Sequence, residues 1–177
     1  MKNSGKITFC AMMAALASVL MATSYFPYLT YGIPALSGLF IMAALIETDV
    51  KWALCAYIAS CVPVFLIAEN EAKLLYIIFF GYYPIVKFLC EKIRSRVVEY
   101  LLKFAVFNVA VLLAYCVFAT VFSVDLGDMG EFGKYTGLIL LLAANFVFVL
   151  YDKAILSVSA FYMQRIHPSV GKILRGK

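Results

Sequence analysis

Polar side chains inside long apolar runs are the places where this sequence could do chemistry, because an amide or a charge buried in lipid is costly without a partner or a function. Asn108 lies within one apolar run, and Asn145, Asp152 and Lys153 lie within the last one. The two asparagines can bond to each other or contact a ligand, and both readings stay open. Asp152 and Lys153 are either interfacial residues or, if they lie at membrane depth, a proton or ion site.

Tyrosines supply the second group of candidates. Tyr82 and Tyr83 lie too deep in their apolar run for the aromatic belt that explains many interfacial tyrosines. Pro84 follows them and predicts a kink that frees a backbone carbonyl near Phe80, so this step can shape the floor of a pocket. Lys87, one turn further on, is expected to extend toward the headgroups. The predicted ligand-binding set is Tyr31, Lys73, Tyr76, Tyr82, Tyr83, Asn108 and Asn145.

The remaining reactive residues form no catalytic or metal-binding pattern. The five cysteines contain no CxxC pair, and most lie inside apolar runs, which predicts packing roles. His167, the single histidine, has no ligand partner at helical spacing, so neither a zinc site nor a Ser-His-Asp triad is predicted. There is no HExxH, no GxSxG and no glycine-rich phosphate loop. We therefore expect no enzyme, no cofactor and no metal.

The composition places the chain in lipid. Hydrophobic residues make up 65% of the sequence, charged residues make up 14%, and the mean hydropathy is +0.96, which leaves too little polar surface for a soluble globule. A helix needs about 20 apolar residues to cross a hydrocarbon layer of roughly 30 Å. The sequence therefore predicts an all-α integral membrane protein, a six-helix bundle forming a single domain over residues 1–177, with spans at about 7–26, 34–46, 51–68, 74–90, 98–122 and 136–163.

The last run is too long for a simple crossing, so it either tilts strongly or bends near residues 151–153. Orientation follows from the cations, because cytoplasmic loops retain Lys and Arg. With six spans, 13 of the 15 Lys and Arg residues fall on the side of the two termini, leaving Lys73 and Lys134 on the other. Both termini are expected in the cytoplasm. The net charge of +5 is then a topology signal, and nucleic-acid binding is not expected.

One alternative concerns the first span. A basic N-terminus followed by an apolar stretch can be a cleaved signal peptide, with Ala15, Leu16 and Ala17 as the small-residue site. Its removal would leave an odd number of spans and would put the basic segment at 87–96 and the basic tail on the opposite side of the membrane from the new N-terminus. An uncleaved first span explains the charge asymmetry more simply.

Two short motifs carry a resemblance to a known family. In "CAMMAALASVLMA" at 10–22, small residues recur at spacings of four, which lets another helix approach closely. This face serves either internal packing or the docking of a separate membrane protein. With "GIPALSGLFIMAAL" at 32–45 and six spans, the chain resembles the substrate-binding S component of energy-coupling factor vitamin transporters. The family's "PALLGGLLFGPLAGA" region is matched at Pro34, Ala35, Leu36 and Gly38.

The resemblance implies a substrate-capturing subunit in a prokaryotic plasma membrane. It implies a small-molecule pocket open to the outside, with transport powered by ATPase subunits through a transmembrane coupling subunit that meets Ala11 and Ala15. Two alternatives remain. One is a non-catalytic cell-envelope scaffold similar to the rod-shape-determining membrane proteins, which needs partner faces and no pocket. The other is a secondary carrier that uses Asp152 and Lys153, for which an inverted repeat is expected and is not visible.

Overall fold

Helices form all the regular structure of the described chain. The computed structural model describes residues 3–26, 29–122, 133–168 and 170. Its α-helices are α1 (Asn3–Ala22), α2 (Gly32–Glu47), α3 (Val50–Ile67), α4 (Asn70–Leu75), α5 (Tyr83–Cys90), α6 (Arg96–Phe122) and α7 (Gly133–Phe161). A 3-10 turn covers Thr23–Tyr25, and π-helical turns cover Tyr76–Phe80 and Tyr162–Ile166. The predicted all-α class is confirmed, and each predicted run is helical over most of its length.

Five helical segments of the described chain are long and apolar enough to cross a membrane, and the 16-residue α2 is a shorter sixth candidate. The fourth of the six segments, Asn70–Cys90, is built from α4, the first π-turn and α5. Their outer surface is apolar: Val19, Leu66 and Phe146 are 67%, 76% and 67% exposed. Such a surface is an aggregation liability in water but has no such cost against lipid tails. The structure therefore indicates a membrane-embedded helical protein.

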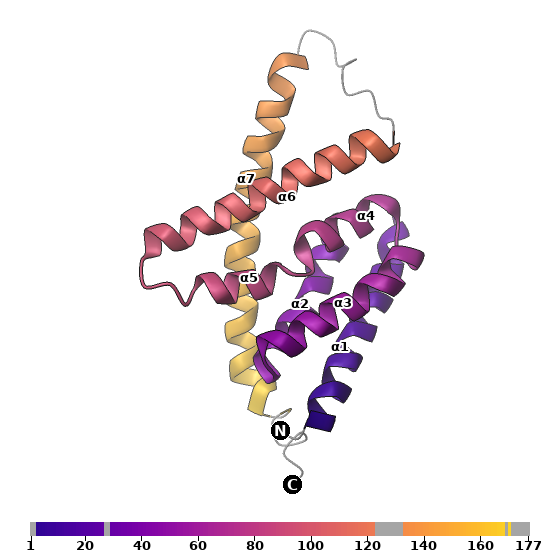
Figure 1. Ribbon diagram of the computed structural model, residues 1–177, viewed down its shortest axis with the longest axis vertical. Helices are drawn as coiled ribbons and strands as arrows, with labels where there is room; N and C mark the ends of the chain where they lie inside the picture. The colour runs from indigo at the N-terminus through magenta and orange to yellow at the C-terminus, as the bar shows by residue number, and fades with distance from the viewer. Residues whose placement is uncertain (1–2, 27–28, 123–132, 169, 171–177) are drawn as a thin grey trace.

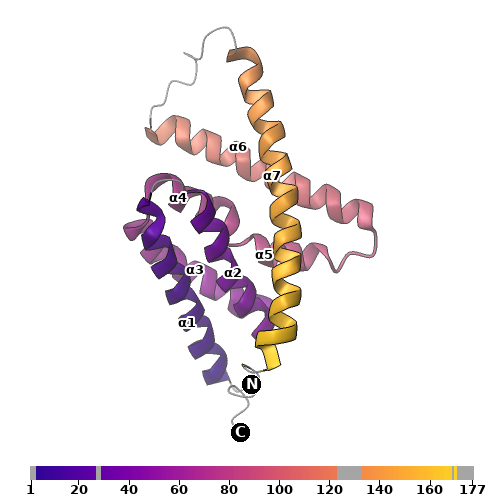
Figure 2. The ribbon, with the colours of Figure 1, turned by 180° about the vertical axis from the view of Figure 1, so that it is seen from behind.

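The first three helices all pack against one another (Figures 1 and 2). Ala14, Ala17 and Ser18 of α1 are buried against α2 and α3, because small side chains let helix backbones approach closely. The link between α2 and α3 is only two residues long. Lys6 at the start of α1 forms an ion pair with Asp49 in this link, which connects α1 to the α2–α3 link and lowers the pKa of the Asp49 carboxyl.

Pro84 interrupts the fourth run, as predicted. Its ring nitrogen carries no proton for the Phe80 carbonyl, and the chain makes a turn at Gly81 and Tyr82 before α5 begins. The Gly81 amide reaches back five residues to the Tyr76 carbonyl at 2.8 Å, the spacing of a π-turn. The Phe80 carbonyl lies against Gly38 of α2, so α2 packs directly on the interrupted backbone.

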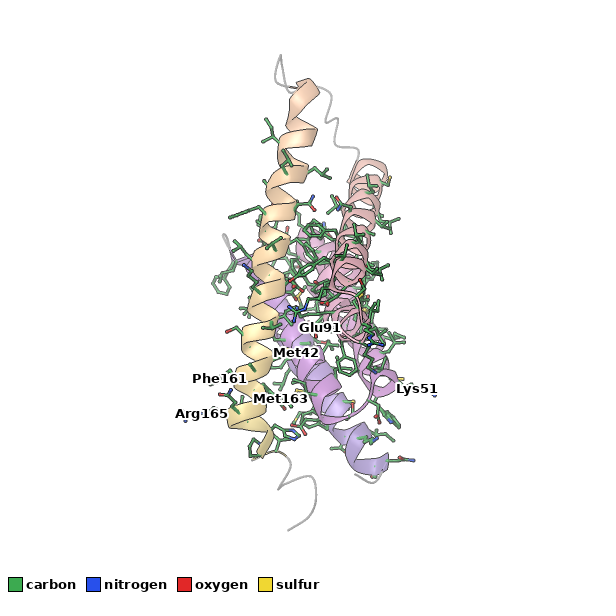
Figure 3. All side chains as sticks on the ribbon, turned by 90° about the vertical axis from the view of Figure 1, so that its left-hand side faces the viewer. Met42, Lys51, Glu91, Phe161, Met163 and Arg165 are labelled. Atoms are coloured by element: carbon green, nitrogen blue, oxygen red, sulfur yellow. The ribbon has the colours of Figure 1, made fainter. Side chains whose placement is uncertain are left out.

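The last run is one uninterrupted α-helix, from Gly133 to Phe161, past residues 151–153. Helix α7 runs beside the bundle of α1, α2 and α3, contacting α2, and crosses α6 obliquely in both ribbon views (Figures 1 and 2). At its lower end Phe161 and Arg165 point away from the bundle (Figure 3). Just beyond, His167 holds this end to α2, because its Nδ1 lies 2.9 Å from the buried Glu47 carboxylate.

Candidate functional site

A cavity of about 370 Å³ lies where the first π-turn, α6 and α7 meet. Its volume falls within the range of roughly 300–1,000 Å³ that small-molecule pockets occupy. The lining is almost entirely apolar, and the first π-turn, α6 and α7 each contribute aromatic rings. The lining residues are Tyr31, Leu75, Ile78, Phe79, Phe80, Phe107, Ala110, Val111, Ala114, Ala144, Val147, Phe148 and Tyr151. Apart from Tyr31, these residues come from the fourth, fifth and sixth apolar runs.

Helical spacing explains why three elements converge on this space. On α6, Phe107, Ala110 and Ala114 recur at intervals of three and four, which places them on one face of the helix. On α7, Ala144 and Phe148 follow the same rule. The two faces meet through Phe107 and Phe148, whose rings stack with centroids 4.5 Å apart and an interplanar angle of 15°.

The π-turn contributes the third wall. Phe79 meets the Phe107 ring edge to face at 5.2 Å, and Phe80 meets the Tyr151 ring at 4.8 Å and 88°. A hydroxyl group from α3 braces this turn, since Tyr57 donates to the Ile77 carbonyl at 2.6 Å. The wall is therefore held from behind by α3.

The mouth of the cavity carries a polar pair. The hydroxyl of Tyr31, just before α2, donates to the Glu71 carboxylate at 2.8 Å. This hydrogen bond raises the pKa of the Tyr31 hydroxyl. Tyr31 is 63% exposed and lines the cavity, so this polar pair lies at an exposed edge of the cavity.

A buried ionic cluster lies beyond the aromatic wall. Tyr83 is fully buried, packs on Phe79 and Phe148, and donates its hydroxyl to Asp152 at 2.6 Å. Lys87 donates to the same carboxylate oxygen at 2.6 Å and to the main-chain oxygen of Asp152 at 3.0 Å. Tyr83 thus joins the aromatic wall to a charge pair between α5 and α7.

A second lysine extends the ionic cluster to α6. The Nζ of Lys103 lies 2.6 Å from Glu99, 3.5 Å from Glu91 and 3.7 Å from Asp152. Glu91 also accepts from Lys87 at 3.2 Å, and its own side chain is 37% exposed. We define the ionic cluster as Tyr83, Lys87, Glu91, Glu99, Lys103 and Asp152. It ties α5, α6 and α7 together, with carboxylates shared between the two ammonium groups.

One sequence interpretation is wrong at this cluster. Lys87 does not extend toward headgroups, because it is 4% exposed and turned inward to Asp152. Lys103, which was counted among the cations on the side of the termini, is also buried, at 2% exposed, within α6. The Asp152 carboxylate pairs with these two lysines from other helices. The i,i+4 spacings of Lys87 with Glu91 and of Glu99 with Lys103 were the sequence feature that could have indicated ion pairing here.

Asn108 and Asn145 meet each other across α6 and α7, so the pairing alternative is observed. Each side-chain amide donates to the other's oxygen at 3.3 Å and to the carbonyl four residues earlier in its own helix at 2.8 Å. Both N–H bonds of each amide are therefore used within the protein. A ligand acceptor that binds either amide nitrogen would have to replace one of these bonds.

The other predicted ligand residues lie toward α3. Tyr76 is buried and hydrogen bonds with Ser60 at 2.8 Å, Tyr82 meets the Tyr57 ring edge to face at 6.0 Å, and Lys73 sits over the Phe65 ring at 5.2 Å. Of the predicted set, Tyr31 alone is among the described residues that line the cavity. The aromatic walls from 79, 80, 107, 148 and 151 were missed, because apolar residues in an apolar run carry no distinguishing signal.

No protein-family model, curated protein or solved structure matches this chain. Within the described residues, no group of three or more His, Cys, Asp and Glu side chains is placed to hold a metal ion. The aromatic cavity is therefore the feature on which a functional proposal rests, and the ionic cluster is the polar structure that supports its floor.

One surface feature bears on partners. Ala11 and Ala15 are exposed on α1, whereas Ala14 and Ala17, on the adjacent face, are buried in the bundle. The small residues of α1 are thus divided between an inner packing face and an outer face that the described chain leaves uncovered.

Proposed function

We propose that this protein captures a small molecule in the aromatic cavity and serves as the substrate-binding subunit of an ATP-driven uptake transporter. The cavity itself carries the proposal: it has the volume and apolar lining of a small-molecule site, and Tyr31 offers a hydroxyl at its mouth. The orientation expected from the cations would open this mouth to the outside. The sequence resemblance to the S components of energy-coupling factor transporters supports the same conclusion.

Uptake against a gradient needs an energy source, which the proposal assigns to separate coupling and ATPase subunits. The exposed small-residue face at Ala11 and Ala15 supports a docking site for the coupling subunit, since small residues permit close helix contact where lipid gives no hydrophobic drive. A scaffold protein could use the same face. The cavity distinguishes the two functions, because a scaffold has no need of one.

Ligand capture is tested by thermal unfolding of the purified protein with a panel of vitamins, nucleobases and related metabolites. We expect at least one compound to stabilise the wild type, because a ligand present at a hundred times its Kd adds about 2.7 kcal/mol to the folded state. Ala110→Phe, which fills the cavity from α6, should abolish the shift, and Ala144→Leu should weaken it from α7. The matched control Ala105→Phe lies on the exposed face of α6 and should preserve it.

A panel without any stabilising compound would favour the scaffold function. A shift that persists unchanged in both Ala110→Phe and Ala144→Leu would place the ligand outside the cavity. Either result contradicts the proposal.

Docking is tested by replacing both Ala11 and Ala15 with leucine. The larger side chains should prevent close helix approach, so the ATPase complex should no longer copurify, while the thermal stability and ligand response of the isolated protein stay unchanged. Ala59→Leu, an exposed alanine on α3, is the control and should retain the complex. Misfolding of the double variant would assign the face to internal packing.

A further inference from the structure

The walls of the aromatic cavity restrict the charge of its ligand. None of the described lining residues carries a formal charge. A charged group moved into such a space loses its hydration without gaining a counter-ion, which is strongly unfavourable. An ionised ligand would therefore need a charge from the protein close to the cavity.

Two carboxylates near the cavity already have partners within the protein. At the mouth, the Glu71 carboxylate accepts the Tyr31 hydroxyl at 2.8 Å. Beyond the wall, Asp152 is neutralised by Lys87 at 2.6 Å. The buried Tyr83 ring stands between Asp152 and the cavity wall, because it packs on Phe79 and Phe148. An anionic ligand group would find no unpaired cation among these groups, and Asp152 is not available to a cationic one.

The shape of the lining favours ligands that contain planar rings. The stacked pair of Phe107 and Phe148 and the edge-on pair of Phe80 and Tyr151 present both faces and edges. Beside them the alanines at 110 and 144 leave space next to the aromatic surface. Aromatic side chains favour offset stacking and edge-to-face contact with other rings, which a planar ligand can make on more than one wall.

Two hydroxyl groups limit where the ligand can be polar. Tyr31 at the mouth is exposed, and the Tyr151 hydroxyl is 3.5 Å from the Ala35 carbonyl, a long hydrogen bond that a ligand group can replace. Given the proposed function, we infer that the cavity binds an uncharged, planar ring compound that places a neutral hydrogen-bonding group near these tyrosines.

Three near-isosteric probes test this ligand class: 2-naphthamide is neutral, 2-naphthoate is anionic and 2-naphthamidine is cationic. Binding to the full protein in lipid nanodiscs is measured by equilibrium dialysis, with empty nanodiscs to subtract partition into lipid. We expect the neutral probe to bind at least ten-fold more tightly than either ion. Ala110→Phe and Ala144→Leu should weaken its binding, and Ala105→Phe should not.

The outcomes separate this inference from the proposed function. Tighter binding of an ion that is lost in Ala110→Phe overturns the ligand class and keeps the cavity as a binding site. A cavity-dependent metabolite in the thermal panel, with none of the three probes bound, also overturns the class. No cavity-dependent binding in either experiment overturns the proposed function. A lipid released from wild-type protein and absent from Ala110→Phe in mass spectra would identify an acyl chain as the occupant and overturn both.

Discussion

Replacing Lys87 with methionine should lower the free energy of unfolding by about 3 kcal/mol, the lower end of the range for breaking a buried ion pair. Methionine keeps the length of the side chain but removes the charge that lies 2.6 Å from Asp152. The carboxylate then keeps the Tyr83 hydroxyl and a more distant ammonium, Lys103 at 3.7 Å. That remaining contact is the reason for expecting the lower end. Reversible denaturation in mixed detergent micelles, followed by circular dichroism, measures the loss.

A second substitution tests whether the loss comes from the stranded charge. Lys87→Met combined with Asp152→Asn removes both charges and keeps an oxygen that accepts from Tyr83. The double variant should be more stable than Lys87→Met alone, because an unpaired buried charge costs more than the absence of the pair. Lys51→Met is the matched control: Lys51 is exposed, and the change should stay within about 0.5 kcal/mol of wild type.

Two results would contradict this account of the cluster. If Lys87→Met is no more destabilising than Lys51→Met, the ammonium is hydrated and not committed to Asp152. If the double variant loses the sum of the two single losses, the two residues act independently.

The helices could be predicted from the sequence because the signals that define them are local. Long apolar runs and their Gly, Pro and charged boundaries depend on neighbouring residues alone, and α2, α3 and α6 begin within a few residues of the predicted runs. The break before Pro84 was predictable for the same reason, since a missing amide proton is a property of one residue.

The candidate site could not be predicted in the same way, because it depends on which helices meet. Lys87 and Asp152 are far apart in sequence, and their pairing needs α5 and α7 side by side. Without that contact, a lysine that extends toward the headgroups has the lower free energy. The same holds for Asn108 and Asn145. Their polarity within apolar runs indicated that each needs a partner, but it did not identify the partner.

The aromatic cavity illustrates a further limit. Phe79, Phe107 and Phe148 are indistinguishable in the sequence from lipid-facing phenylalanines, and Phe146, two positions before Phe148, is indeed exposed. Helical periodicity separates the two faces only after the positions of the neighbouring helices are known. The predicted ligand-binding residues were chosen because polar side chains stand out in apolar runs, whereas most residues that line the cavity are apolar.

Gly38→Ala should be the second strongly destabilising change, with a loss of about 1–3 kcal/mol, as for other overpacked positions. A Cβ atom at this position would lie 2.4 Å from the Phe80 carbonyl oxygen and 3.0 Å from the Tyr151 hydroxyl. The first of these is backbone and cannot rotate away, so α2 and the π-turn must separate. In a helix interior without such a neighbour, the same change stabilises by roughly 0.5–1 kcal/mol.

Gly32→Ala is the matched control, because a Cβ at the first residue of α2 meets nothing within 4 Å. It should be neutral or slightly stabilising in the same denaturation measurement, and Gly38→Ala should have the opposite sign. The separation would also displace Phe80 and Tyr151, which line the cavity. Gly38→Ala should therefore weaken binding of any cavity ligand, while Gly32→Ala leaves it intact. Equal stability of the two alanine variants would mean that α2 does not rest on the interrupted backbone, and that the wall of the cavity is positioned by α3, α6 and α7 without it.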